Sequence, residues 1–184
     1  MYLGLKLTSD MRRNEHVDYV CSKARKAFLS LRRNVFNATP EVKSLAYKTL
    51  IRPTIEYAKT VWDPYTSGSH SKLDEIHRLA ARFIFNKYCR GHSPTQPCEL
   101  AKLPSLELRT EYDRLKILFL IIHDHGKIDK NDYYRISPDE YFRNRHSMYI
   151  PPPTVRNDCF KHSFYPTAIK QWNMLTDATV RPYL

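Results

Sequence analysis

The residues whose types and spacing could do chemistry are basic side chains on a predicted helix over residues 14 to 36. Lys26 and Arg33 lie seven residues apart, so they fall nearly in register on the face opposite the apolar stripe. Three further cations flank this pair: Lys23, Arg25 and Arg32. A row of cations can neutralise the phosphates of a nucleic acid and release its counterions. The pattern predicts a phosphate-binding face, and the alternative is a solvated helix face that binds nothing.

A second basic pair lies on a predicted helix over residues 71 to 88. Arg78 and Arg82 share its outer face with Phe85, and this trio could stack on a base or contact another domain. A simpler interpretation is an ion pair between Asp74 and Arg78, with Phe85 covered by the C-terminal segment. We include Arg78 and Arg82 among the predicted nucleic-acid-binding residues.

Cysteine and histidine residues in the middle of the chain superficially match a zinc site. Cys89-x-x-His92 is followed by Cys98, and His123 or His125 could supply a fourth ligand. This spacing matches no zinc finger or zinc knuckle pattern. We therefore expect neither a metal site nor a bound cofactor in this chain.

The overall charge favours a polyanionic partner. Lys and Arg total 30 against 19 Asp and Glu, which gives a net charge of +11. Such an excess favours nucleic acid first and an anionic membrane surface second. With 184 residues, of which 42% are hydrophobic, the chain is long enough to bury a core, so disorder throughout is excluded.

The cysteines and the apolar runs bear on location. Four widely spaced cysteines and an N-terminus without the features of a signal peptide favour an intracellular protein with reduced thiols, in the nucleus or the cytoplasm. The longest apolar run, Ile117 to Ile122, is far shorter than the roughly 20 apolar residues that cross a bilayer. We expect no membrane partner.

Hydrophobic periodicity predicts the elements that would position these residues. Residues 2 to 7 alternate, so we expect a strand whose partners lie upstream of Met1. Asn14 would cap the first helix. The buried stripe of that helix is expected to be Val17, Val20, Ala24, Phe28, Leu31 and Val35.

The middle of the chain contains further helix signals. Thr39-Pro40 starts a helix, which Pro53 breaks or kinks near Ile51 and which restarts toward Trp62. The inner face of that helix would comprise Val42, Leu45, Ala46 and Thr49. Trp62 is expected to form a packed aromatic corner with two tyrosines, Tyr57 and Tyr65.

The remaining helices follow from capping signals. A capping box at Ser71 opens the helix to residue 88, with Leu73, Ile76, Ala80, Phe83 and Ile84 facing inward. Ser105 caps a strongly apolar helix that ends at Gly126. Its buried stripe would be Leu108, Tyr112, Leu115, Phe119 and Ile122. A last short helix over residues 166 to 175 carries Trp172, which should anchor the C-terminal segment.

These elements predict a mainly helical fold. We expect a small bundle of four or five helices with an N-terminal orphan strand and an irregular C-terminal extension. The expected parts are residues 1–8 (the strand), 9–126 (the helical domain) and 127–184 (the Tyr- and Pro-rich extension).

Three segments follow one another in an informative order. They are Tyr2-Leu3-Gly4-Leu5-Lys6-Leu7, the helix with Val17-Asp18-Tyr19-Val20 and Leu31-Arg32-Arg33-Asn34, and the block from Leu45 to Tyr65 with Ile51-Arg52-Pro53 and Val61-Trp62-Asp63-Pro64. Shorter matches follow at residues 78–84, 103–109, 163–166 and 172–173. Together they resemble the reverse transcriptases of non-LTR (LINE-like) retrotransposons, in the part that follows the polymerase palm. By this resemblance the first segment is a primer-grip-like strand and the next two belong to the thumb domain.

The resemblance implies a partner and a missing activity. Such a thumb grips the primer-template duplex of RNA and DNA, mainly through sugars and phosphates, so binding would tolerate any sequence. The family's polymerase centre holds Mg²⁺ on paired aspartates in an upstream palm domain. This sequence contains no Asp-Asp pair. We therefore expect a fragment that is not an enzyme on its own and whose partners are the duplex and the palm.

Two other functions stay open from the sequence. The chain could be a protein-interaction module, whose strand and bare helix faces dock onto the palm or another protein. It could also be an inert, truncated retroelement product that folds without binding nucleic acid.

The absence of an Asp-Asp pair gives the first prediction. Primer extension on an RNA template, with magnesium or manganese, should show no nucleotide incorporation by the pure chain, because nothing aligns two metal ions at a primer end. Metal-dependent incorporation would overturn this expectation.

Overall fold

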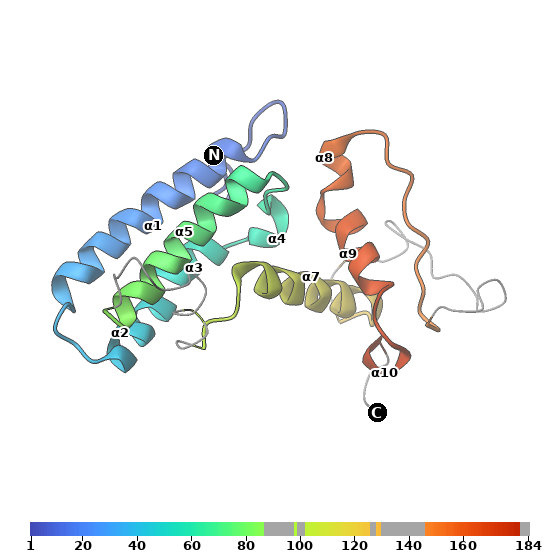
Figure 1. Cartoon of the computed structure of the whole chain (residues 1–184). Coiled ribbons are helices and arrows are strands. Elements are labelled where there is room, and N and C mark those ends of the chain that lie inside the picture. The colour runs from blue at the N-terminus through green and yellow to red at the C-terminus, as the bar shows by residue number, and fades with distance from the viewer. Residues whose placement is uncertain (87–97, 99–101, 126–127, 130–145, 181–184) are drawn as a thin grey trace. The chain divides into compact units, whose positions relative to one another are not determined.

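The structure is a computed structural model of the whole chain, and it describes the following residues: 1–86, 98, 102–125, 128–129 and 146–180 (Figure 1). Over these residues the protein is mainly helical and forms a small helical bundle, which confirms the predicted fold class. Contacts divide the chain into two compact units, Met1–Thr110 and Glu111–Leu184, each with its own apolar core. The predicted division after residue 126 stays a prediction.

Unit 1 is built around two long helices that lie side by side, α1 and α5 (Figure 1). Its helical elements are, in chain order, α1 (Asn14–Asn34), α2 (Pro40–Ala46), the π-helix η1 (Tyr47–Ile51), α3 (Arg52–Glu56), α4 (Lys59–Trp62), α5 (Ser67–Ile84) and the first turn of α7 (Leu106–Ile122). Besides α5, α1 packs on η1 and α3, and α2 packs on α5. The core therefore joins segments that are distant in the sequence.

The buried faces of α1 and α5 are those that helical periodicity predicts. In α1 the buried apolar residues include Val17, Val20, Ala24, Phe28 and Leu31, and in α5 they include Leu73, Ile76, Ala80, Phe83 and Ile84. Val35 is partly buried against the same core. The rings of Phe28 and Phe83 meet edge to face with their centroids 5.7 Å apart. Burial of these two stripes against each other holds unit 1 together.

The start of α5 differs from the prediction. The helix begins at Ser67, so the predicted capping box at Ser71 is wrong. The carbonyl of Thr66 accepts the backbone N–H groups of Ser69 and His70, both at 3.1 Å, and these bonds set the first turn ahead of Ser71. The predicted end of this helix, Tyr88, lies outside the described residues.

The second helix widens next to Pro53, near the predicted position, but it stays helical through Glu56 and turns only at Tyr57 and Ala58. The backbone of η1 widens so that the N–H of Arg52 reaches the carbonyl of Tyr47, five residues earlier. Pro53, which has no N–H to donate, then sits in the first turn of α3. A left-handed residue, Ala58, with φ of 50°, turns the chain from α3 into α4.

The predicted inner face of α2 is wrong except at Ala46, which is partly buried against the core. Val42 and Leu45 are 48% and 63% exposed and Thr49 is also exposed, whereas Lys43 and Tyr47 are buried. The Nζ atom of Lys43 donates to Asn86 Oδ1 at 3.0 Å and lies 4.8 Å from the centroid of the Phe83 ring. These tertiary partners make the inner position favourable for a lysine, whose aliphatic stem is apolar.

The N-terminal segment is a tight turn, so the predicted strand over residues 2 to 7 is wrong; no strand forms within the described part of the chain. Tyr2 and Leu5 exchange two backbone hydrogen bonds of 2.8 Å. Leu3 and Gly4 between them have φ of 43° and 83°, as in a type I′ turn. The alternating residues mimic a strand, but Gly4 lets the chain reverse, and Leu5 then enters the core.

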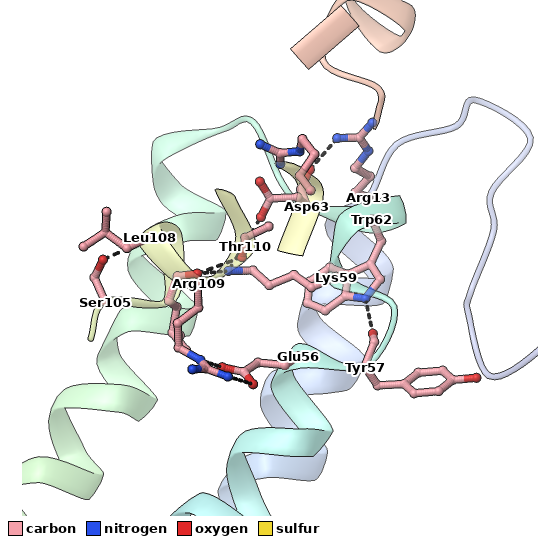
Figure 2. A network of polar contacts seen from close by, with 12 residues as sticks. Arg13, Glu56, Tyr57, Lys59, Trp62, Asp63, Ser105, Leu108, Arg109 and Thr110 are labelled. Atoms are coloured by element: carbon pink, nitrogen blue, oxygen red, sulfur yellow. Dashed lines mark hydrogen bonds and ion pairs between the residues drawn. The ribbon is translucent and has the colours of Figure 1, made fainter. Parts of the chain in front are cut away.

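A polar network closes the corner between α3, α4 and the first turn of α7 (Figure 2). The buried Lys59 donates from Nζ to the carbonyl of Leu106 at 3.2 Å and lies 3.6 Å from the carboxylate of Asp63. Arg109 donates two hydrogen bonds to the Glu56 carboxylate, with 2.9 Å between Nη2 and Oε2. Burial lowers the pKa of the Lys59 ammonium group, and the Asp63 carboxylate opposes that shift.

One residue of the predicted aromatic corner is buried. Trp62 donates from Nε1 to the carbonyl of Tyr57 at 2.8 Å (Figure 2) and packs edge to face on the His16 ring, 4.8 Å away. The side chains of Tyr57 and Tyr65 are exposed, so the prediction is wrong for both. The hydroxyl of Tyr57 instead donates to the carbonyl of Leu3 at 3.1 Å.

Unit 2 is organised around Trp172, as predicted. Its helices are the rest of α7, α8 (Asp158–Lys161), α9 (Phe164–Trp172) and α10 (Asp177–Val180). Trp172 is 1% exposed, donates from Nε1 to the carbonyl of Met148 at 2.9 Å, and packs near the Phe119 ring of α7. Next to it, Asn173 makes hydrogen bonds of 2.7 and 3.1 Å with the backbone carbonyl and N–H of Ile150, as a neighbouring strand would. The tail is therefore anchored by side chains.

The buried face of α7 is only partly the predicted one. Ser105 caps the helix as predicted, since its hydroxyl accepts the N–H of Leu108 at 3.2 Å. Leu108 and Tyr112 are 61% and 67% exposed, which makes these two stripe positions wrong. The buried positions are Leu106, Thr110, Arg114, Leu118, Ile121 and Ile122. Two polar members of this face make hydrogen bonds: Thr110 donates to the carbonyl of Leu106 at 2.7 Å, and Arg114 donates from Nη1 to Gln171 Oε1 at 2.9 Å. Gly126, the predicted end, lies outside the described residues.

The N-terminal turn predicts a backbone effect on stability. We expect Gly4→Ala to lower the free energy of unfolding by about 1 kcal/mol, because φ of 83° disfavours any Cβ. That Cβ would also lie 3.3 Å from Tyr57 Cε1. Gly68→Ala is the matched control: it lies in α5 with nothing within 4 Å of the new Cβ, so it should stabilise by about 0.5 kcal/mol. Equal effects in urea denaturation would contradict the assigned turn.

Two buried histidines predict a pH dependence of stability. Burial lowers the pKa of His16, whose Nδ1 accepts the backbone N–H of Lys6 at 3.1 Å, and that of His77, which pairs with Tyr47 at 2.8 Å. Between these lowered pKa values and the ordinary value of about 6.5, the unfolded chain binds more protons. The free energy of unfolding should therefore fall as the pH drops from 7.5 to 5.

Substitution separates the buried histidines from other titrating groups. His16→Asn offers an amide oxygen to the same N–H without titrating, so it should flatten the pH dependence. The matched variant at the partly exposed His70, His70→Asn, should leave the dependence intact. A wild-type stability that does not change over this pH range would refute the effect.

Candidate nucleic-acid interface

The excess of positive charge belongs to unit 1. Residues 1–110 contain 19 Lys and Arg against 10 Asp and Glu, whereas residues 111–184 contain 11 against 9. If basic and acidic residues were distributed evenly along the chain, the two units would have similar ratios of basic to acidic residues. The electrostatic attraction for an anion would therefore be greater at unit 1 than at unit 2.

The outer face of α1 presents the cations that the sequence predicted for it. Lys23, Lys26 and Arg33 are exposed, because the buried stripe of α1 faces α5 and the centre of the bundle. Within the described ranges none of the three forms an ion pair with a carboxylate. At 1.5 Å per residue, Lys23 and Arg33 are about 15 Å apart along the helix axis. This row of three residues, the cation row, can contact phosphates.

Arg25 lies at the seam between the two long helices. Its Nη2 atom is 2.6 Å from the Glu75 carboxylate of α5, and Lys72 and Asp18 form a similar pair at 2.5 Å. All four side chains are about half exposed, so these ion pairs contribute little to stability. Arg25, which was predicted to bind nucleic acid, thus also forms an ion pair within unit 1.

The C-terminal end of α1 carries an open hollow. It has a volume of about 590 Å³, and its lining residues are Leu29, Arg32, Arg33 and Phe36. Arg33 belongs both to the cation row and to this hollow. Leu29 and Phe36 are not among the predicted site residues. Their signal in the sequence is an apolar side chain on the charged side of an amphipathic helix.

Arg78 and Arg82 differ from the cations of α1. Both lie on α5 and are only partly exposed. The structure does not bring them together with the cation row through any hydrogen bond or ion pair among described residues. Their predicted contact with nucleic acid stays a prediction.

The described residues form neither a metal site nor a membrane span. Within the described residues, no group of three or more His, Cys, Asp or Glu side chains could hold a metal ion. Cys89 and His92 of the superficial zinc pattern lie outside those residues, and His123 is hydrogen-bonded to the carbonyl of Val180 at 3.2 Å. No helix in the described part of the chain combines the length and apolarity that a membrane span requires.

Comparison with known proteins adds no assignment. Protein-family models, curated proteins and solved structures were all searched, and none matches this chain. The function must therefore be argued from the residues and their geometry.

Proposed function

We propose that this chain is the thumb and post-thumb region of a non-LTR retrotransposon reverse transcriptase, and that α1 grips the phosphates of an RNA–DNA primer-template duplex. The palm with its aspartates and Mg²⁺ would lie outside this sequence. On its own the chain would then bind the duplex without extending the primer.

The observation that carries this proposal is the cation row. Lys23, Lys26 and Arg33 are exposed on one helix face and have no carboxylate partner among described residues. Contacts from such a row reach phosphates and leave the base edges unread, as a polymerase that copies any sequence requires. The concentration of positive charge in unit 1 supports the same partner.

A second candidate function is docking onto another protein domain, such as the palm. It is favoured by apolar side chains that α2 and η1 leave exposed: Val42, Leu45 and Leu50 are 48%, 63% and 62% exposed. Docking onto a protein needs no affinity for nucleic acid. An inert truncated product would bind neither nucleic acid nor another protein domain. A duplex-binding measurement therefore separates the first proposal from both alternatives.

Fluorescence anisotropy with a labelled RNA–DNA hybrid tests the proposal. Wild-type affinity should fall steeply with salt, because each phosphate contact releases counterions. Replacing Lys26 and Arg33 by Ala should weaken binding and reduce the slope of log K against log salt by about 2, since roughly 0.9 is lost per phosphate contact.

The matched control removes the same charge from unit 2. Lys116 and Lys170 are both exposed there, and the K116A/K170A variant should keep the wild-type slope. Equal losses in the two double variants would show that only net charge matters, and an unchanged slope in K26A/R33A would reject the cation row. If the wild-type chain does not bind the hybrid at all, docking becomes the better assignment.

A further inference from the structure

We propose that the hollow at the end of α1 holds one unpaired nucleotide, with its base against Phe36 and its phosphate at Arg33; this inference rests on the proposed duplex grip. On this proposal, the hollow lies where a single-stranded template or primer leaves the duplex.

The lining of the hollow combines two kinds of surface. Leu29 and Phe36 are 55% and 50% exposed, so apolar surface lies open beside charged side chains. Arg32 and Arg33 supply guanidinium groups, and among the residues that the structure describes no acidic side chain lines the hollow. Its volume of about 590 Å³ falls within the range of small-molecule sites.

Phe36 is supported from inside the bundle. The Nζ atom of Lys43 lies 5.7 Å from the centroid of the Phe36 ring and 4.8 Å from that of Phe83. Lys43 is itself 1% exposed, and Asn86 accepts its hydrogen bond at 3.0 Å. A buried and bonded lysine under the ring fixes Phe36 as a platform. A ligand that stacks on a fixed ring loses less entropy than one that must order it.

A nucleotide matches this combination better than other anions do. Its base is flat and can stack on an aromatic ring, whatever the base, and its phosphate pairs with a guanidinium group. Inorganic phosphate would leave Leu29 and Phe36 uncovered. The cation row leads to the hollow. Lys26 and Arg33 are about 10 Å apart along the axis of α1, so a nucleic-acid strand bound at Lys26 can continue to the hollow.

Two hybrid duplexes test the inference, one blunt and one with a short single-stranded tail that carries 2-aminopurine. The wild-type chain should bind the tailed duplex about tenfold more tightly than the blunt one, the gain expected of one stacked base. Phe36→Leu keeps an apolar side chain but removes the aromatic face, so it should abolish that gain and leave the affinity for the blunt duplex unchanged. Leu45→Ala, which truncates an exposed apolar residue of α2 outside the hollow, should keep the gain.

The outcomes separate this inference from the proposed function. Equal wild-type affinity for the two duplexes would overturn the nucleotide site while the duplex grip stands. If the blunt duplex did not bind, the proposed grip of α1 on the duplex would be overturned. Binding of the single-stranded tail that depends on Phe36 would still support the nucleotide site. Quenching of 2-aminopurine fluorescence by the wild-type chain, and its loss in Phe36→Leu, gives a readout that is independent of affinity. A tail preference retained in a folded Phe36→Leu variant, as judged by circular dichroism, would reject the platform.

Discussion

The packing of α1 against α5 is the constraint on which unit 1 depends. The apolar side of α1 runs from Val17 to Leu31 and meets the apolar side of α5, with Phe28 and Phe83 in contact. Because the sides of a helix are fixed relative to one another, burying this stripe leaves Lys26 and Arg33 in water. The cation row is thus a consequence of how the core is built, and the exposed ion pairs at the seam add little to it.

Buried cations hold the shorter elements in place. Lys43 lies among two aromatic rings and Asn86, Lys59 contacts the Leu106 carbonyl and the Asp63 carboxylate, and Arg114 bonds to Gln171. A buried charge is costly unless such partners are present, so each of these contacts specifies where the chain must bend or dock. Lys43 also lies 5.7 Å from the centroid of the Phe36 ring, which lines the hollow.

The residues on which the predicted resemblance to reverse transcriptases rests are mainly structural. Pro53 follows the π-helix, Trp62 is buried in the corner with Lys59, and Trp172 with Asn173 anchors the tail of unit 2. The motif residues define an architecture, whereas the proposed contacts with nucleic acid depend on exposed side chains such as Lys26. A chain could keep this architecture and lose the binding, which is why the proposed function needs its own experiments.

The sequence by itself determined the features that depend on local chemistry. The buried stripe of α1, the widening of the helix next to Pro53 and the cap at Ser105 follow from periodicity, a missing N–H and a hydroxyl acceptor. The predicted cap at Asn14 is wrong, because Arg13 is the N-cap of α1 and the Asn14 side chain instead accepts the hydroxyl of Ser69 at 3.2 Å. Tertiary structure decided which side of α2 is buried, because Lys43 is stable inside only beside Phe83 and Asn86, some forty residues away along the printed sequence. It also decided the reversal at Gly4 and the hollow at Phe36. Periodicity describes one segment at a time, and these features depend on partners that folding alone brings together.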